Sequence, residues 1–173
     1  MKSTIAISVI AGDISGVPSN ALITAINSEG LWYGGIDRVI QGKAGNGFHS
    51  QATSAMPLRD GQTVVARGKG ISNGGKFENV VFVVDDLERP LNEIVSAGLR
   101  AADNSGYESV TIPTIRMGVM LGIVEKTTEE VAHEMAKGIA TFKEAGQQSL
   151  KSITFVVYND AVAERILREA MVR

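Results

Sequence analysis

The sequence predicts one domain of the α/β class, because strand-like and helix-like segments alternate along its 173 residues. Several of the strand-like segments are continuous runs of β-branched and other apolar residues, which are typical of strands covered on both faces. No internal repeat, linker or low-complexity tract interrupts this alternation. Residues 1–173 are therefore expected to form a single domain around a largely parallel or mixed sheet.

Strands are predicted where short apolar runs are bounded by turn residues. The six predicted strands cover residues 4–10, 21–26, 63–67, 80–84, 109–112 and 153–157. Between the third and fourth of them, residues 69–76 are rich in glycine and polar side chains, so they are expected to form a hairpin or surface loop.

Three longer helices are predicted from their start signals and from apolar residues at helical spacing. Pro90 suits a first helical position, and Thr127 with Glu130 forms a capping-box pattern. The last helix is expected to begin near Asn159 or Asp160. Shorter helices are expected over residues 36–42 and around residues 49–55.

Composition excludes several classes of function. The chain has 17 basic and 19 acidic residues, for a formal net charge of -2, which argues against a dedicated nucleic-acid-binding protein. This balance does not exclude a small anionic ligand, since a few backbone N–H groups can hold a phosphate. The absence of cysteine excludes disulfides, cysteine-ligated zinc and thiol nucleophiles. No apolar stretch approaches the roughly 20 residues that span a bilayer, and a cytoplasmic protein without membrane contact is expected.

Candidate metal and phosphate motifs are incomplete. Residues 70–77 nearly match a phosphate-binding P-loop, but no Ser or Thr follows Lys76, and a strand rather than a helix comes next. His49 and His133 each lack a second ligand at zinc-site spacing, so each is interpreted as an ordinary surface or half-buried histidine. The Asp85-Asp86 pair could bind a cation or begin a solvated loop. Neither a metal nor a cofactor is expected.

Three loops that follow predicted strands are the candidate ligand site, because α/β folds bind ligands beyond the carboxyl ends of their strands. The first is Gly12-Asp13-Ile14. The second covers residues 27–37 and leads through glycines into a helix, whose N-terminus favours an anion. The third covers residues 113–122.

Together these loops resemble the motifs of the macro domain family. The resemblance consists of Gly12-Asp13-Ile14 after the first strand, Thr24-Ala25-Ile26-Asn27 followed by Gly34-Gly35-Ile36-Asp37, Pro113-Thr114-Ile115-Arg116-Met117-Gly118, and Tyr158-Asn159 after the last strand. Each motif is modest alone, but the four occur in the family's order and span nearly the whole chain.

The resemblance implies a three-layer α/β/α fold with a mixed central sheet and a cleft for ADP-ribose or ADP-ribosylated protein. It assigns the adenine group to Asp13, Ile14 and Tyr158, the diphosphate to backbone N–H groups, and the distal ribose to Asn27. The backbone groups are those of Gly34, Gly35 and Ile36 at the helix start and of Gly118, Val119 and Met120 in the third loop. Asp37 matches the acidic residue that hydrolytic members use to activate water, so Asn27 and Asp37 are the candidate catalytic residues.

Some residues depart from the family pattern. Thr24 replaces an asparagine, Trp32 and Tyr33 stand where glycines are common, and Met120 replaces an aromatic residue. Arg116 either forms a salt bridge with a ligand phosphate or is a solvent-facing loop arginine. These changes fall in the part of the cleft where the distal ribose is expected.

The residues also have simpler interpretations. Asp13 could cap the turn after the first strand, Asp37 could be a first-turn helix acid, and Tyr158 could lie at the core edge. Three functions follow: a hydrolase acting on an ADP-ribosyl or ADP-ribose-phosphate bond, a non-catalytic module that binds or sequesters such a nucleotide, or a degenerate cleft on a fold that contacts proteins. The sequence does not fix the oligomeric state.

Overall fold

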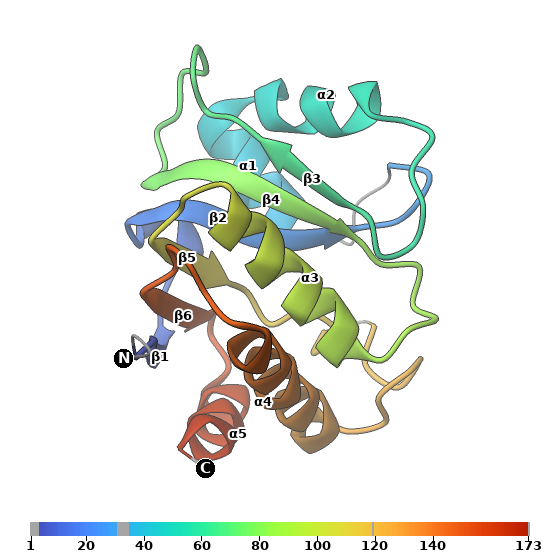
Figure 1. Cartoon of the computed structure of the whole chain (residues 1–173), viewed down its shortest axis with the longest axis vertical. Helices are drawn as coiled ribbons and strands as arrows, with labels where there is room; N and C mark the ends of the chain where they lie inside the picture. The colour runs from blue at the N-terminus through green and yellow to red at the C-terminus, as the bar shows by residue number, and fades with distance from the viewer. Residues whose placement is uncertain (1–3, 31–34, 119, 173) are drawn as a thin grey trace.

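A computed structural model of the chain describes residues 4–30, 35–118 and 120–172 (Figure 1). Its strands are β1 (Ala6–Ala11), β2 (Ser19–Ile26), β3 (Thr63–Ala66), β4 (Phe77–Val84), β5 (Ser109–Ile112) and β6 (Ser152–Val157). Its helices are α1 (Gly35–Ala44), α2 (Gly47–Ser54), α3 (Leu91–Asn104), α4 (Thr128–Ala145) and α5 (Ala161–Met171), with a short 3-10 turn, η1 (Ile14–Gly16).

The six strands form one mixed sheet in the order β1-β6-β5-β2-β4-β3. Neighbouring strands pair in parallel from β1 through β4, whereas β3 pairs antiparallel with β4. The loop over residues 67–76 joins β3 to β4 and closes this hairpin, as the sequence predicts. Because five strands run in the same direction, the loops that follow them meet at one edge of the sheet.

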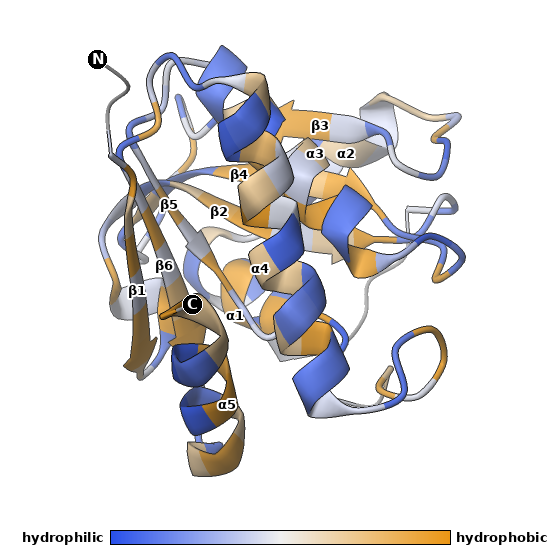
Figure 2. Cartoon of the chain, turned by 60° about the horizontal axis from the view of Figure 1, so that its bottom comes forward, coloured by the Kyte–Doolittle hydropathy of each residue, from blue (hydrophilic) through white to orange (hydrophobic). Residues whose placement is uncertain are grey.

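Helices cover both faces of the sheet, so the domain has three layers (Figure 1). Ile23 and Val81 contribute to a core cluster shared with α3, α4 and α5. Their chain neighbours Leu22 and Val80 point the other way, into a second cluster shared with α1 and α2. Alternate residues of a strand point to opposite faces, and a strand covered on both sides must therefore be apolar throughout. In Figure 2 the strands are largely hydrophobic, whereas α4 and α5 each carry hydrophilic and hydrophobic sides.

Close helix packing on one face depends on two glycines. A Cβ atom at Gly98 would lie 2.7 Å from Ile23 Cγ2 of the sheet, and one at Gly138 would lie 2.7 Å from the Asn92 carbonyl of α3. Glycine destabilises a helix by roughly 1 kcal/mol relative to alanine. At these two positions it instead allows α3 to lie closer to β2 and α4 to lie closer to α3.

Helix starts follow the predicted signals to within one residue. Thr127 caps α4, its hydroxyl oxygen accepting the Glu130 N–H at 3.1 Å, and Asp160 caps α5 through the Ala163 N–H at 3.0 Å. Pro90 precedes the first helical residue of α3 as its N-cap, so its prediction as the first helical residue is one position early. The Pro90 side chain closes no capping hydrogen bond there.

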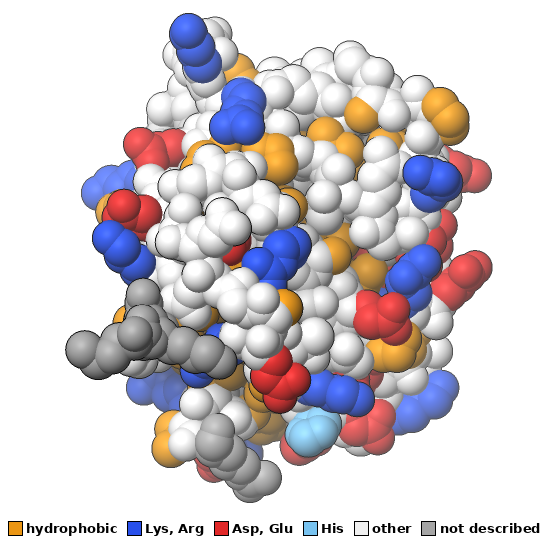
Figure 3. Space-filling view, viewed as in Figure 1, with side chains coloured by type: hydrophobic (Ala, Val, Ile, Leu, Met, Phe, Trp, Pro, Cys, Tyr) orange, Lys and Arg blue, Asp and Glu red, His pale blue; other side chains and the backbone are white. Residues whose placement is uncertain are grey.

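The surface over α3 and α4 carries acidic and basic side chains side by side (Figure 3), in keeping with the near-neutral composition. None of the described helices is long and apolar enough to cross a bilayer.

Candidate functional site

A cavity of about 510 Å³ lies at the sheet edge where β1, β6, β5, β2 and β4 end. This volume is within the usual range for small-molecule sites. The described residues that line it are Gly12, Asp13, Ile14, Thr24, Ala25, Gly35, Ile36, Val39, Asp85, Leu87, Pro113, Thr114, Ile115, Arg116, Gly118, Met120, Val156 and Tyr158.

The cavity collects the ligand-binding residues that the sequence predicts. Two of those ten residues, Gly34 and Val119, lie outside the described residues, as do Trp32 and Tyr33. The remaining eight all line the cavity: Asp13, Ile14, Gly35, Ile36, Arg116, Gly118, Met120 and Tyr158. They come from four separate segments of the chain, so their convergence is a property of the fold.

The end of the cavity near β1 and β6 combines a carboxylate with an aromatic ring. Asp13 Oδ1 accepts hydrogen bonds from the Ser15 hydroxyl at 2.8 Å and the Ser15 N–H at 2.9 Å, which lower the pKa of Asp13 below its usual value. Asp13 therefore caps η1 and remains charged at neutral pH, with its carboxylate exposed. Ile14 beside it is buried, whereas the Tyr158 side chain is 76% exposed. That exposure rules out a place for Tyr158 at the core edge.

The middle of the cavity is formed by main chain rather than by basic side chains. Helix α1 begins at Gly35, so the N–H groups of its first turn and the positive end of its dipole lie at the cavity wall. Gly118 faces this wall from the loop after β5 and is exposed. Such an arrangement suits an anion, because backbone N–H groups can bind phosphate oxygens without a counter-charge.

Arg116 differs from both sequence interpretations. It is only 5% exposed, so it is not a solvent-facing arginine. Its Nε and Nη2 donate to Asp85 Oδ2 at 3.0 Å and Oδ1 at 2.6 Å, and its Nη1 donates to Glu125 Oε1 at 2.8 Å. These carboxylates hold the guanidinium in internal ion pairs, so this geometry does not favour the alternative of a salt bridge to a ligand phosphate.

The buried ion pairs also correct the interpretation of Asp85. Asp85 is 1% exposed, so it does not begin a solvated loop. Its carboxylate forms an ion pair with Arg116, and this contact takes the place of the cation considered from the sequence. Burial lowers the pKa of Arg116, but the hydrogen bonds that it donates to Asp85 and Glu125 outweigh that effect and raise the pKa above its ordinary value. The described residues contain no cluster of three or more His, Cys, Asp or Glu that could hold a metal.

The two candidate catalytic residues are not among the described residues that line the cavity. The Asn27 side chain turns back and accepts the Glu29 N–H at 3.0 Å through Oδ1. Asp37 does lie in the first turn of α1, yet it is only 4% exposed and points toward α2. Their catalytic roles stay predictions, and this geometry does not favour them.

Asp37 has a neighbour that sequence reasoning missed. His49 of α2 is 3% exposed rather than half-buried, and its Nε2 lies 3.7 Å from Asp37 Oδ1. The His49 ring also packs on Phe82, with 5.3 Å between ring centroids. Separation by 12 positions across two helices gives no recognisable sequence spacing.

Several lining residues were also not predicted. Asp85 and Leu87 follow the carboxyl end of β4, whereas Ala25 and Val156 are the second-last residues of β2 and β6. The available signal was positional: a residue at or just beyond the carboxyl end of a parallel strand is a candidate for the site whatever its type.

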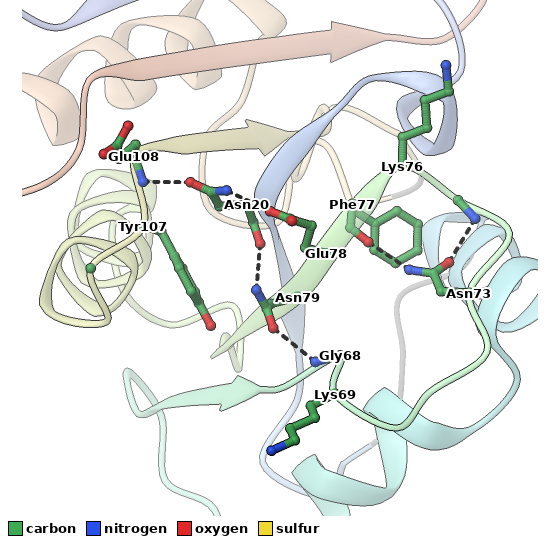
Figure 4. A pocket seen from close by; sticks show the side chains of 12 residues that line it. Asn20, Gly68, Lys69, Asn73, Lys76, Phe77, Glu78, Asn79, Tyr107 and Glu108 are labelled. Carbon is green, nitrogen blue, oxygen red and sulfur yellow. Dashed lines mark hydrogen bonds between the residues drawn. The ribbon is translucent and has the colours of Figure 1, made fainter.

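A second hollow lies at the opposite, amino end of the strands (Figure 4) and has a volume of about 720 Å³. Three asparagines dominate its wall, and each uses both ends of its amide within the protein. Asn20 donates to Glu78 Oε2 at 2.6 Å and accepts the Glu108 N–H at 2.8 Å. Asn79 donates to the Asn20 carbonyl and accepts the Gly68 N–H, and Asn73 bridges the Phe77 carbonyl and the Gly75 N–H. These bonds stabilise the strand starts and use both ends of all three amides within the protein.

The fold is that of solved macrodomain structures. The chain matches the Trypanosoma brucei macrodomain in complex with ADP-ribose at a TM-score of 0.78 and 17% identity, over 94% of this chain and 68% of that one. It matches an Oceanobacillus iheyensis macrodomain mutant with ADPR at a TM-score of 0.70 and 17% identity, over 95% of this chain and 90% of that one. For the Oceanobacillus iheyensis macrodomain with ADP, the TM-score is 0.69 and the identity 18%, over 99% of this chain and 94% of that one.

Sequence comparison adds little to this. An uncharacterized protein of Aquifex aeolicus is 28% identical over 142 residues, which are 79% of this chain and 82% of that protein. No family model matches the sequence. The structural matches confirm the predicted three-layer α/β/α fold with a mixed sheet. Their sequence identities of 17% and 18% are too low to show more than the fold.

Proposed function

We propose that this protein binds ADP-ribose, free or attached to a protein, in the cavity at the carboxyl ends of its strands. The observation that carries the proposal is the convergence of all eight described candidate ligand residues on that one cavity. The macrodomain structures with the same fold that contain ADP-ribose or ADP support the same ligand class.

The adenine group is proposed to lie at the β1 and β6 end. Asp13 Oδ1 is already used by Ser15, and Oδ2 accepts no hydrogen bond from the described residues, so it is free to accept one from the adenine amino group. The exposed ring of Tyr158 offers a flat surface on which the base can stack.

The diphosphate is proposed to lie between the start of α1 and the loop after β5. There the N–H groups of Gly35, Ile36, Gly118 and Met120 supply donors, and the α1 dipole adds a favourable field. The distal ribose then extends toward β2 and β4, beside Thr24 and Leu87, because these strands come next in the sheet order.

Binding without turnover is the better-supported form of this function. Hydrolysis rests on Asn27 and Asp37, and neither is among the described residues that line the cavity. We therefore expect no release of product when the protein is incubated with ADP-ribosylated protein or with ADP-ribose 1''-phosphate. If the wild-type protein forms product steadily and Asp37→Ala abolishes this activity, the hydrolase hypothesis is the correct one.

A direct test uses two exposed glycines as a matched pair. At Gly118 and Gly42 an added Cβ meets nothing within 4 Å and the backbone needs no left-handed conformation, so both accept a side chain. Gly118→Glu places bulk and negative charge at the diphosphate, and we expect ADP-ribose affinity to fall by about 100-fold or more, or about 2.7 kcal/mol. Gly42→Glu adds the same charge on α1, outside the cavity lining, and should leave affinity unchanged.

Calorimetric titration of both variants gives the affinities, and thermal denaturation shows that both remain folded. If wild-type protein fails to bind ADP-ribose at millimolar concentration, the proposed function is wrong. An equal loss of affinity in both variants would place the ligand elsewhere.

A further inference from the structure

Arg116 lines the proposed nucleotide cavity, yet its charged group points into the protein. The side chain is 2% exposed and donates to four acceptors: both oxygens of Asp85, Glu125 Oε1 and the Arg89 carbonyl, the last at 2.8 Å. The guanidinium is planar and its N–H donors cannot move independently, so these four hydrogen bonds fix the orientation of the group.

The contacts tie the loop between β5 and α4, which contains both Arg116 and Glu125, to segments that are distant in sequence. Asp85 directly follows β4, Arg116 lies in the loop after β5, and Glu125 precedes α4. Glu125 extends the network through Oε2, which accepts the Leu91 N–H at the start of α3 at 3.1 Å. Arg116 is therefore the link between the third cavity loop and the rest of the fold.

The backbone at this link is in an unfavourable conformation. Arg116 has φ 65, in the left-handed region, which is sterically unfavourable for a residue with a Cβ. Leu87, whose N–H donates to the same Asp85 Oδ1 at 3.0 Å, also has a positive φ of 60. Residues in such conformations persist where the surroundings over-determine them, and here the ion pairs supply that constraint.

Backbone hydrogen bonds hold the segment between Arg116 and Glu125, which contains the proposed phosphate donors. Gly118 is two residues further on, and its carbonyl accepts the Leu121 N–H at 3.0 Å. The Gly122 N–H in turn donates to the Glu125 carbonyl at 2.9 Å. One end of the loop is thus fixed by the Arg116 side chain and the other by the Glu125 main chain.

We propose that Arg116 is a positioning residue: through Asp85 and Glu125 it holds the backbone of Gly118 and Met120 in the form that binds the diphosphate, without touching the ligand. This inference rests on the proposed function. Two carboxylates and one guanidinium carry a formal charge of -1 together, so the cluster offers no attraction to a further ligand phosphate.

The test replaces the guanidinium while keeping its charge. In Arg116→Lys, one ammonium cannot reach all four acceptors, although the positive charge and the strained backbone remain. We expect affinities for ADP-ribose and ADP to fall by similar factors, roughly 3- to 30-fold, as for other coupled positions outside a ligand's contacts. Affinity for adenosine, which has no phosphate, should not change. Amide hydrogens of Gly118 and Met120 should exchange faster in the ligand-free variant.

The matched control is Arg100→Lys. Arg100 also donates to a buried carboxylate and to two carbonyls, those of Asp103, Gly146 and Phe142, but on α3 away from the cavity. This control should lower the melting temperature without changing any of the three affinities. If Arg116→Lys does not fold, Glu125→Gln, which leaves the Asp85 contacts of Arg116 in place, should give the same pattern with a smaller factor.

Three outcomes would overturn the inference: unchanged ADP-ribose affinity and amide exchange in Arg116→Lys, an equal loss for adenosine, or a much larger loss for ADP-ribose 1''-phosphate than for ADP-ribose. The last would mean direct contact with a phosphate. If wild-type protein binds no nucleotide, the proposed function fails, whereas the exchange of Gly118 and Met120 still decides whether Arg116 positions the loop.

Discussion

The two ends of the sheet differ in how their polar groups are used. At the amino end, the hollow of about 720 Å³ is larger than the cavity of about 510 Å³ at the carboxyl end. Yet the asparagines of the hollow bond to the protein at both ends of each amide, whereas Asp13 in the cavity uses one oxygen for Ser15 and keeps the other exposed. The amides in the hollow are therefore committed to the fold, whereas Asp13 in the cavity has an oxygen that no described residue uses.

The two ends of the sheet also differ in backbone conformation. Among the described residues, those other than glycine with positive φ are Leu87, Arg116 and Asn159, and all three lie in loops at the cavity end. Strain of this kind persists only where neighbouring contacts enforce it. Near the hollow, the described lining residue with positive φ is Gly106, and glycine adopts this conformation without a steric penalty.

The largest effect that would sharpen this contrast is expected at Asp103, near the amino end. Its buried carboxylate accepts the N–H groups of Gln148, Ser149 and Leu150 and anchors the loop before β6. Asp103→Ala leaves these donors without an acceptor and should lower the free energy of unfolding by about 3 kcal/mol in urea denaturation. ADP-ribose affinity should stay the same, and a change in it would contradict the separation of the two ends.

The same carboxylate sets a pH dependence. Burial raises the pKa of Asp103, but the three backbone donors outweigh it and hold the pKa below the ordinary 3.8. A group whose pKa is lower in the folded state contributes stability above the unfolded value and loses it as pH falls through the folded value. The stability difference between wild type and Asp103→Ala should therefore be constant from about pH 5 to 8 and narrow only below pH 3.8.

A smaller effect, on binding alone, is expected at Tyr158. Removing the ring in Tyr158→Ala should weaken ADP-ribose binding by roughly 1–3 kcal/mol, the range for a stacked base. Because the side chain is 76% exposed, the melting temperature should hardly change. Val162→Ala is the control, since Val162 is 58% exposed on neighbouring α5 and does not line the cavity. Equal affinity in wild type and Tyr158→Ala would remove Tyr158 from the site.

The smallest effect is expected at Asn20 in the hollow. Asn20→Ala removes hydrogen bonds that are partly exposed, so we expect a loss of about 1 kcal/mol in unfolding free energy and no change in ADP-ribose affinity. Lys69→Ala at the same hollow should change neither quantity, because Lys69 is exposed. Weaker binding in Asn20→Ala would show that the hollow takes part in function.

The sequence alone determined the elements and the chain segments that meet at the cavity. Apolar runs and cap residues such as Thr127 and Asp160 act locally, so all six strands and five helices could be predicted to within a few residues. The ligand loops could also be found, because parallel strands present their carboxyl ends at one edge. For that reason Asp13, Gly35, Gly118 and Tyr158 meet in the cavity as expected.

Only the tertiary structure decided where charged side chains point. Arg116, Asp85 and Glu125 look like ordinary loop residues in the sequence, yet they form a buried network because three strand and helix ends converge on them. Asp37 and His49 meet in the same way, between two helices. A long polar side chain can turn toward solvent, ligand or another loop, and that choice depends on charges brought near by the fold, which no local pattern records.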